Sequence, residues 1–326
     1  MNKLLINKKN IIIFFIIFLI SIILRLYYFS KLDSWFDEWN MLYTVDPFIT
    51  NTLTWERFFG DRGDRFIPEY YPPINAFILK YFLLITGYCT ENARIYSLLF
   101  GSLSTWLIYI LSNMMTNKKK EYFATFLFSI NLFLIWQSNE IRPHSFVLFF
   151  SLLNIILFIK IINNNKGLIL YLSYIIFSIL LLSSWPFALT IYFGKTIYAI
   201  FHYKIKKIKI NRLLSIFFII LIFYIFINNE YLIYHLKRTE HYTNLKITFF
   251  YSFHFRSFFG SIFLGGLFLI IFSFYLLKDL KKNIISKDKY NILLYIIIST
   301  YFLTISYSII KAGVISPKYV IYILLI

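Results

Sequence analysis

The sequence predicts an all-α, polytopic membrane protein. Two observations support this prediction: a series of long apolar runs, and short clusters of lysine that alternate between them. Of the 326 residues, 59% are hydrophobic and only 15% are charged, whereas a soluble domain carries about 25% charged residues. A chain of this length and composition is typical of an integral membrane protein.

The first apolar run, Asn10–Phe29, follows several lysines and has the outline of a signal peptide. No small-residue cleavage site follows it, and the run is long enough to span, so we expect an uncleaved first helix. Residues 30–92 then form a mostly polar segment that is broken by glycines and prolines.

Nine further apolar runs follow this polar segment: Ile95–Leu111, Tyr122–Trp136, Phe146–Ile162, Leu168–Ser184, Phe187–Phe201, Leu213–Ile227, Phe258–Leu277, Ile292–Ile310 and Tyr319–Ile326. Several are short for a hydrocarbon layer about 30 Å thick, so we expect a tilted or kinked pair within Tyr122–Ile162. The last run is too short to span, and it is either a half-helix or the end of a truncated chain.

Lysine and arginine fall mainly in alternate gaps between the runs: Lys118–Lys120, Lys166, Lys204–Arg212 and Lys278–Lys289. By the positive-inside rule these gaps face the cytoplasm, which places the N-terminus inside and predicts about ten spans. This topology explains the net charge of +18, and we expect no nucleic-acid partner. The remaining gaps lie outside: 30–92, Gln137–His144, Trp185-Pro186, Asn228–Arg256 and Lys311–Lys318.

Acidic residues are concentrated in the first outer segment, which holds nine of the 15: Asp33, Asp37, Glu38, Asp46, Glu56, Asp61, Asp64, Glu69 and Glu91. None lies in the middle of an apolar run, whereas transporters and proton pumps usually keep carboxylates at mid-bilayer. We therefore expect any chemistry at the outer surface.

Two adjacent carboxylates, Asp37 and Glu38, follow the first span and are flanked by Trp35 and Trp39. Neighbours on a helix point about 100° apart, so only one acid can face a substrate atom. The other would then hold a backbone amide or a nearby cation. Alternatively, the pair only starts a short surface helix, where acids favour the helix dipole. The residues alone leave both interpretations open.

Glu69 and Tyr71 precede Pro72-Pro73 at the end of the outer segment. The prolines restrict Tyr71 to an extended conformation and can start a helix over Ile74–Ile85. The prolines thus have a structural reason, and the functional interpretation is that this turn places Glu69 or Tyr71 at the site.

Arg142 is a second candidate site residue, because its planar guanidinium can bind phosphate. The alternative is that Arg142 is an interfacial arginine whose side chain snorkels to water. Lys318 either pairs with a phosphate or marks the interface. The basic outer segment Asn228–Arg256 either favours an anionic ligand, such as a lipid phosphate, or carries ordinary loop charge. The five histidines, His144 among them, show no ligand spacing, so we expect no histidine-built zinc site.

These motifs, in order, resemble those of the polyprenyl-phosphate-sugar-dependent glycosyltransferases of the GT-C superfamily. The chain is most similar to bacterial members of family 39, akin to protein O-mannosyltransferases and the lipid A aminoarabinose transferase. The resemblance covers the whole chain and is strongest over Asn10–Phe150. The matching pieces are Asp37-Glu38, Pro72-Pro73, Ala93–Gly101, Ser138–His144 and Pro317-Lys318-Tyr319.

The chain departs from its relatives at three of these places. It has Tyr71-Pro72-Pro73 where relatives often have His-Pro-Pro, and Arg142-Pro143-His144 where they often have Arg-Pro-Tyr. The late Arg-Tyr pair is Lys318-Tyr319 here, and the large part that follows in many relatives is missing.

The resemblance implies one GT-C-type transmembrane helical bundle over residues 1–326, with short helices in the long first extracytoplasmic loop, 30–92. The protein would lie in the bacterial cytoplasmic (inner) membrane, with its active site outside, and serve glycan biosynthesis in the cell envelope. A polyprenyl-phosphate sugar would enter from the membrane lipid. The sugar would pass, with inversion, to a hydroxyl of a glycan, lipid or protein acceptor.

The resemblance also assigns roles. Asp37, beside its catalytic neighbour Glu38, would take the proton of the acceptor hydroxyl. Arg142 and Lys318 would stabilise the leaving lipid phosphate. The other substrate-binding residues would be His144, Tyr319, Tyr71 and Glu69. This family generally uses no metal, so we expect neither a metal nor another cofactor.

Two other classes of function remain as alternatives: a transporter or flippase for lipid-linked sugars, and a non-catalytic membrane assembly protein. A transporter would show mid-membrane charges and a repeat between the chain halves, and we find neither in the sequence. An assembly protein would tolerate replacement of both Asp37 and Glu38.

Overall fold

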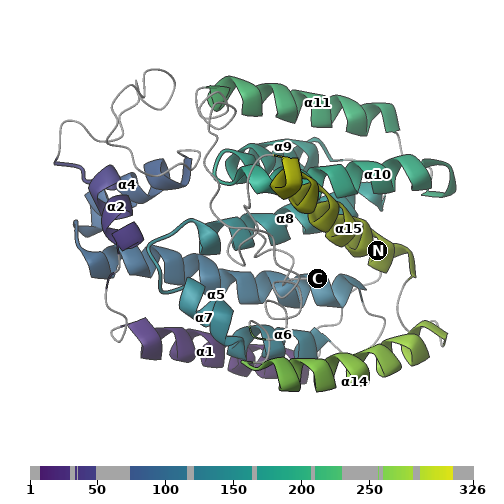
Figure 1. The fold of residues 1–326 in the computed structure, drawn as a ribbon, viewed down its shortest axis with the longest axis horizontal. Helices are drawn as coiled ribbons and strands as arrows, with labels where there is room; N and C mark the ends of the chain where they lie inside the picture. The colour runs from purple at the N-terminus through teal and green to yellow at the C-terminus, as the bar shows by residue number, and fades with distance from the viewer. Residues whose placement is uncertain are drawn as a thin grey trace.

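The computed structural model describes residues 8–29, 34, 36–48, 74–115, 121–163, 167–206, 210–229, 256, 260–281 and 287–310. Within these residues the regular secondary structure is entirely helical, which confirms the predicted fold class (Figure 1). The helices are α1 (Lys8–Phe29), α2 (Phe36–Val45), α4 (Ile74–Thr86), α5 (Thr90–Met115), α6 (Glu121–Ile130), α7 (Leu132–Gln137), α8 (His144–Ile162), α9 (Leu168–Leu182), η1 (Pro186–Ala188), α10 (Leu189–Lys206), α11 (Ile210–Ile227), α14 (Ile262–Lys281) and α15 (Lys287–Ile310).

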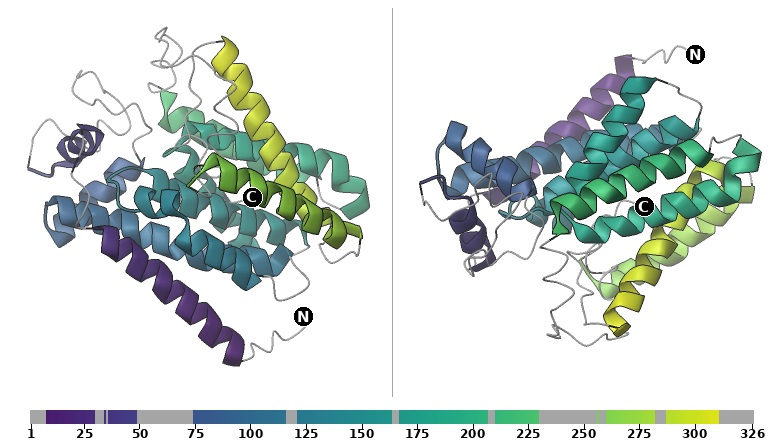
Figure 2. Two further views of the ribbon diagram at one scale, coloured as in Figure 1. Left: turned by 60° about the horizontal axis from the view of Figure 1, so that its bottom comes forward. Right: turned by 90° about the horizontal axis from the view of Figure 1, so that it is seen from above.

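The core of the bundle is the contact between α5 and α8 (Figure 1). Helix α8 is apolar all round and buried on nearly every side, as expected for a helix enclosed by others. Helix α1 lies against α5 and α6 at the edge of the bundle, with one long face uncovered (Figure 2). That face exposes Ile12, Phe15, Leu19 and Ile23, which suits contact with lipid.

Four of the described helices are long and apolar enough to cross a membrane: Ile11–Phe29, Thr90–Met115, His144–Ile162 and Ile210–Ile227. Three shorter apolar helices accompany them: Ile74–Thr86, Leu168–Leu182 and Asn291–Tyr307. Each predicted apolar run within the described residues forms helix, so the polytopic architecture is confirmed. The final run, Tyr319–Ile326, lies outside the described residues.

The predicted run Tyr122–Trp136 is divided at Asn131 into α6 and α7, a break within the run that the sequence analysis did not predict. The Asn131 backbone is extended (φ −66°, ψ 114°), and its side chain accepts a hydrogen bond from the Leu134 N–H at 3.0 Å. Asn131 thus caps α7, because it satisfies one of the amides that a helix start leaves unpaired. The short α7 leads into the turn 138–143 before α8.

Four of the segments predicted to share the outer side meet at one end of the bundle. The Ile74 N–H donates to the Ser183 carbonyl at 3.2 Å, and Asn228 Nδ2 donates to Ser183 Oγ at 3.1 Å. The His144 ring stands edge-on to Trp185, with 5.3 Å between ring centroids. Because these contacts join segments far apart in sequence, residues of the first loop, 137–144, 183–186 and 228 lie together.

Candidate functional site

The two adjacent carboxylates lie in the first turn of α2, at the end of the bundle where these segments meet. This position favours both acids electrostatically, because the N-terminus of a helix carries partial positive charge. The helix-start interpretation is therefore correct as a description of the local structure. The contacts of the two side chains show whether they also bind other parts of the protein.

Glu38 is buried, with 2% of its side chain exposed, and both carboxylate oxygens are engaged. Glu38 Oε2 lies 3.1 Å from Arg94 Nη2, and Glu38 Oε1 accepts a hydrogen bond from the Ile141 N–H at 2.9 Å. These are the amide and the cation that the sequence predicted for one member of the pair. Glu38 therefore joins α2 to α5 and to the turn before α8.

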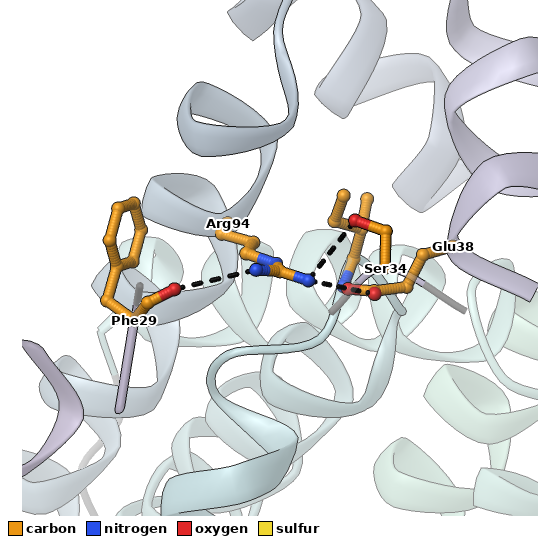
Figure 3. A network of polar contacts seen from close by, with 5 residues as sticks. Phe29, Ser34, Glu38 and Arg94 are labelled. Carbon is orange, nitrogen blue, oxygen red and sulfur yellow. Dashed lines mark hydrogen bonds and ion pairs between the residues drawn. The ribbon is translucent and has the colours of Figure 1, made fainter. Parts of the chain in front are cut away.

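Arg94 extends this network to the end of α1 (Figure 3). Its guanidinium donates to the Phe29 carbonyl at 3.5 Å and to Ser34 Oγ at 3.3 Å, in addition to Glu38. With 7% of its side chain exposed, Arg94 is almost as buried as its partner. One guanidinium thus fixes how the chain leaves α1 and enters α2.

Asp37 faces the more open side, with 29% of its side chain exposed. Asp37 Oδ2 lies 3.2 Å from Arg142 Nη2, and only 4% of the Arg142 side chain is exposed. An arginine that snorkels to water would be exposed, so this burial argues against the interfacial alternative for Arg142. Asp37 is accordingly the more accessible member of the pair.

The turn 138–143 carries two of these contacts, those of Ile141 and Arg142. Its backbone is folded on itself, since the Arg142 N–H donates to the Glu140 carbonyl at 2.8 Å. Pro143 ends the turn and occupies the N-cap position of α8, where its missing N–H costs nothing. The turn therefore presents one backbone N–H and one guanidinium to the adjacent acids of α2.

The C-terminal half of α2 is held by Tyr88, in the short connection between α4 and α5. Tyr88 OH donates to the Leu42 carbonyl at 3.0 Å. Burial, together with the nearby negative charge of Asp46, raises the pKa of Tyr88 to about 12. Tyr88 therefore stays protonated at physiological pH and remains a donor that anchors α2.

The remaining predicted site residues are less directly placed. His144 is the first residue of α8 and is fully buried with its ring edge-on to Trp185. Glu69, Tyr71, Lys318 and Tyr319 lie outside the described residues, so their predicted roles stay predictions. Within the residues that the structure describes, no group of three or more His, Cys, Asp or Glu side chains is placed to hold a metal ion.

Sequence reasoning did not assign a role to Arg94, although the motif Ala93–Gly101 contained it. Its position in the first turns of an apolar span could have indicated a role. An unpaired cation there is costly, so an acidic partner should have been sought. The backbone N–H of Ile141 left no signal, because any residue type carries one.

Lys195 in α10 is a fully buried cation that sequence reasoning missed. Its ammonium donates to Asn154 Oδ1 and to Tyr174 OH, the latter at 2.8 Å. It also lies 3.8 Å from the centre of the Tyr192 ring, within range of a cation–π interaction. Oxygen atoms and aromatic faces from α8, α9 and α10 thus solvate this charge.

Residues 71–229 match the family described as dolichyl-phosphate-mannose-protein mannosyltransferase. The matched stretch includes Arg94 and Arg142 but begins after Asp37 and Glu38. A search of curated proteins found no match.

Proposed function

Because the chain belongs, over residues 71–229, to the dolichyl-phosphate-mannose-protein mannosyltransferase family, we propose that it transfers a sugar, with inversion, from a polyprenyl phosphate to an acceptor hydroxyl. Membership makes the chain a glycosyltransferase with a lipid-phosphate sugar donor. The inverting mechanism, the acceptor class and the extracytoplasmic position of the site are our proposals.

The observation that carries this proposal is the division of labour between the two acids. Glu38 uses both oxygens within the protein, whereas Asp37 is partly exposed and lies 3.2 Å from the Arg142 guanidinium. We therefore assign the general base to Asp37 and a positioning role to Glu38. A base must reach its proton directly, and only the exposed acid can do so.

The reaction balances as a single displacement. The acceptor oxygen forms a bond to the anomeric carbon while its proton passes to Asp37. The bond from that carbon to the phosphate oxygen breaks on the opposite face of the sugar, which inverts the anomeric configuration. The bonding electron pair leaves with the lipid phosphate, which needs positive charge rather than a proton.

Arg142 supplies positive charge next to the base. Its guanidinium has five N–H donors, and its Nη2 faces Asp37 at 3.2 Å. A planar fork of this kind can bind a phosphate alongside a carboxylate, and so orient the leaving group relative to the base. Lys318 is the second predicted cation, and together with Tyr319, Tyr71 and Glu69 it completes the proposed substrate-binding set.

The position outside the membrane is supported by topology. The alternating lysine clusters predict that the first loop and the segment 137–144 lie on the extracytoplasmic side. The contacts of Glu38 and Asp37 with the turn 138–143 agree with that assignment, because they require both segments to share one side. We propose that the polyprenyl donor reaches this end of the bundle from the lipid.

Transport of lipid-linked sugars is the second candidate, and Lys195 is the observation that favours it. A transport site, however, opens to water on alternate sides of the membrane. Lys195 is fully buried and enclosed by side chains of three helices, among them Asn154 and Tyr174. This setting is better explained by helix packing than by a substrate path.

The proposal is tested with membranes that contain the full chain and labelled polyprenyl-phosphate sugars. Asp37→Asn should lower transfer by at least about a hundredfold at normal expression, because general bases contribute about 10²–10⁴-fold. The matched control is Asp46→Asn, at the other end of α2, where the side chain accepts from the Phe48 N–H at 2.8 Å and an amide oxygen can do the same. Undiminished transfer by Asp37→Asn would refute the assignment.

A further inference from the structure

Arg25 is a fully buried cation in the membrane-spanning helix α1, four residues before its last residue, Phe29. Its Nε donates to Ser138 Oγ at 3.1 Å. Its Nη1 donates to the Ser21 carbonyl at 3.1 Å and also to Ser21 Oγ. Ser21 Oγ is in turn hydrogen-bonded to Thr105 Oγ1 of α5 at 2.8 Å. Arg25 therefore connects α1 with α5 and with the residue that follows α7.

Stability alone does not account for an arginine at this position. Among the described residues no carboxylate forms an ion pair with Arg25, and its Nη2 has no hydrogen-bond acceptor. A buried guanidinium without an anionic partner is costly, and well-packed apolar side chains often replace buried ions without loss of stability. A role in the function of the protein is the better explanation for this arginine.

The contact with Ser138 links Arg25 to the candidate site. Ser138 begins the turn 138–143, and its hydroxyl donates to the Leu134 carbonyl at 2.6 Å while it accepts from Arg25. Three residues later the Ile141 N–H bonds to Glu38, and Arg142 then pairs with Asp37. The start of the turn is thus fixed from within α1, and its end is fixed by the two acids of α2.

Gly101 of α5 makes room for this link. A Cβ at Gly101 would lie 2.2 Å from Ser138 Oγ and 3.3 Å from Arg25 Nε. Any side chain would therefore displace Ser138, Arg25 or both. Gly101 on α5 and Arg25 on α1 therefore both fix the position of Ser138.

We propose that Arg25 is a positioning residue for the transfer reaction. It touches neither substrate nor base. Through Ser138 it sets the turn that presents the Ile141 N–H to Glu38 and the Arg142 guanidinium to Asp37. This inference rests on the proposed function, because it assigns Arg25 to the geometry of the same site.

The kinetic test uses the purified full chain in lipid nanodiscs and compares Arg25→Gln, Arg25→Lys and Ser138→Ala. A misplacement of about 1 Å can cost about a hundredfold in rate, so Arg25→Gln should lower kcat by about tenfold to a hundredfold, with a smaller change in the donor KM. Ser138→Ala should lower kcat in the same direction. In the Ser138→Ala background, Arg25→Gln should cost less than it does alone, because contacting residues are not additive.

The control is Ser299→Ala, which removes a buried hydrogen bond of 2.8 Å to the Thr190 carbonyl between α15 and α10. Like Ser138→Ala, it deletes one buried hydroxyl, and it should leave kcat unchanged. If Ser299→Ala lowers kcat as much as Ser138→Ala at equal loss of thermal stability, the effect is general and the positioning role is overturned.

A second measurement does not depend on transfer. Hydrogen exchange of the Ile141 amide should be faster in Arg25→Gln and in Ser138→Ala than in the unmodified chain, and unchanged in Ser299→Ala. Unchanged exchange in both site variants would overturn the inference. If the unmodified chain transfers no sugar, the proposed function fails, and the exchange result alone decides whether Arg25 positions the turn. If Arg25→Gln does not fold, Ser138→Ala and Arg25→Lys carry the same test.

Discussion

The buried ion pair between Glu38 and Arg94 should be one of the most sensitive contacts of the chain. At their separation of 3.1 Å, two unit charges attract by about 5 kcal/mol in a medium of effective dielectric constant about 20. Desolvation offsets much of this attraction while both partners are present. Once Arg94 is replaced by methionine, Glu38 keeps its desolvation cost without compensation, so we expect a loss of about 3–5 kcal/mol.

The assay is the thermal unfolding of detergent-solubilised protein. At about 2 °C per kcal/mol for a large chain, Arg94→Met should lower the unfolding temperature by about 6–10 °C. Glu38→Gln should cost less, because a glutamine oxygen can still accept from the Ile141 N–H.

The double variant of Glu38→Gln and Arg94→Met separates the energy of the ion pair from the cost of burying each charge. Because Glu38 and Arg94 are in direct contact, the loss in the double variant should be smaller than the sum of the two single losses by about 2 kcal/mol. Additive losses, or a loss below about 1 kcal/mol in Arg94→Met, would refute the view that this pair holds α2 in place.

Three further outcomes follow from the same contacts. Arg142→Lys keeps the charge but loses the planar fork, so transfer should fall by about tenfold to a hundredfold, and Arg142→Ala should cost more in the same transfer assay. Gly194→Ala would place a Cβ 2.6 Å from Ser299 Oγ between α10 and α15 and should lower the free energy of unfolding by about 1–3 kcal/mol, measured by thermal unfolding. Gly266→Ala, which has no atom of the described residues within 4 Å of its Cβ, should leave the stability unchanged. Lys195→Ala should lower the free energy of unfolding by about 3–5 kcal/mol, because it leaves a cavity and buried acceptors without their donor. Lys195→Met, whose side chain is longer, should lower it less in the same thermal unfolding assay.

Sequence patterns predicted the helices well, because each helix is specified by its own residues. Runs such as Leu213–Ile227 are apolar over most of their length, and the backbone of a helix pairs with itself in lipid. The break at Asn131 within the run Tyr122–Trp136 was not predicted, because one asparagine in an apolar run is a weak local signal for a helix start. The helix predicted over Ile74–Ile85 forms as α4, directly after Pro73.

The site was only partly predictable, because its contacts join positions far apart in the chain. Glu38 bonds to residues 56 and 103 positions away, namely Arg94 and Ile141, and no local pattern specifies such pairs. The division between the two acids did follow from local geometry, since helical neighbours point in different directions. Which acid turned inward could not be predicted, because that depends on where α5 and the turn before α8 lie.

Lys195 was missed for a different reason. The run Phe187–Phe201 is otherwise mostly apolar, so its single lysine did not prevent the prediction of a span. Its partners Asn154 and Tyr174 come from two other helices and are separately unremarkable in sequence. A buried charge in a span is costly, so the lysine itself was the signal, and it should have prompted a search for acceptors on neighbouring helices.

The two acids and the two arginines of the site come from different parts of the chain. Arg94 and Arg142 lie within the stretch that matches the mannosyltransferase family, whereas Asp37 and Glu38 precede it. The matched stretch thus carries cations, and α2 brings the carboxylates that neutralise them at 3.1 and 3.2 Å. Docking of α2 therefore brings in the proposed catalytic pair and gives both buried arginines a carboxylate partner. Replacement of Glu38, which is buried, should therefore lower both the stability of α2 and the transfer activity. Replacement of Asp37, which is 29% exposed, should lower the activity with a smaller loss of stability, because water can reach its position.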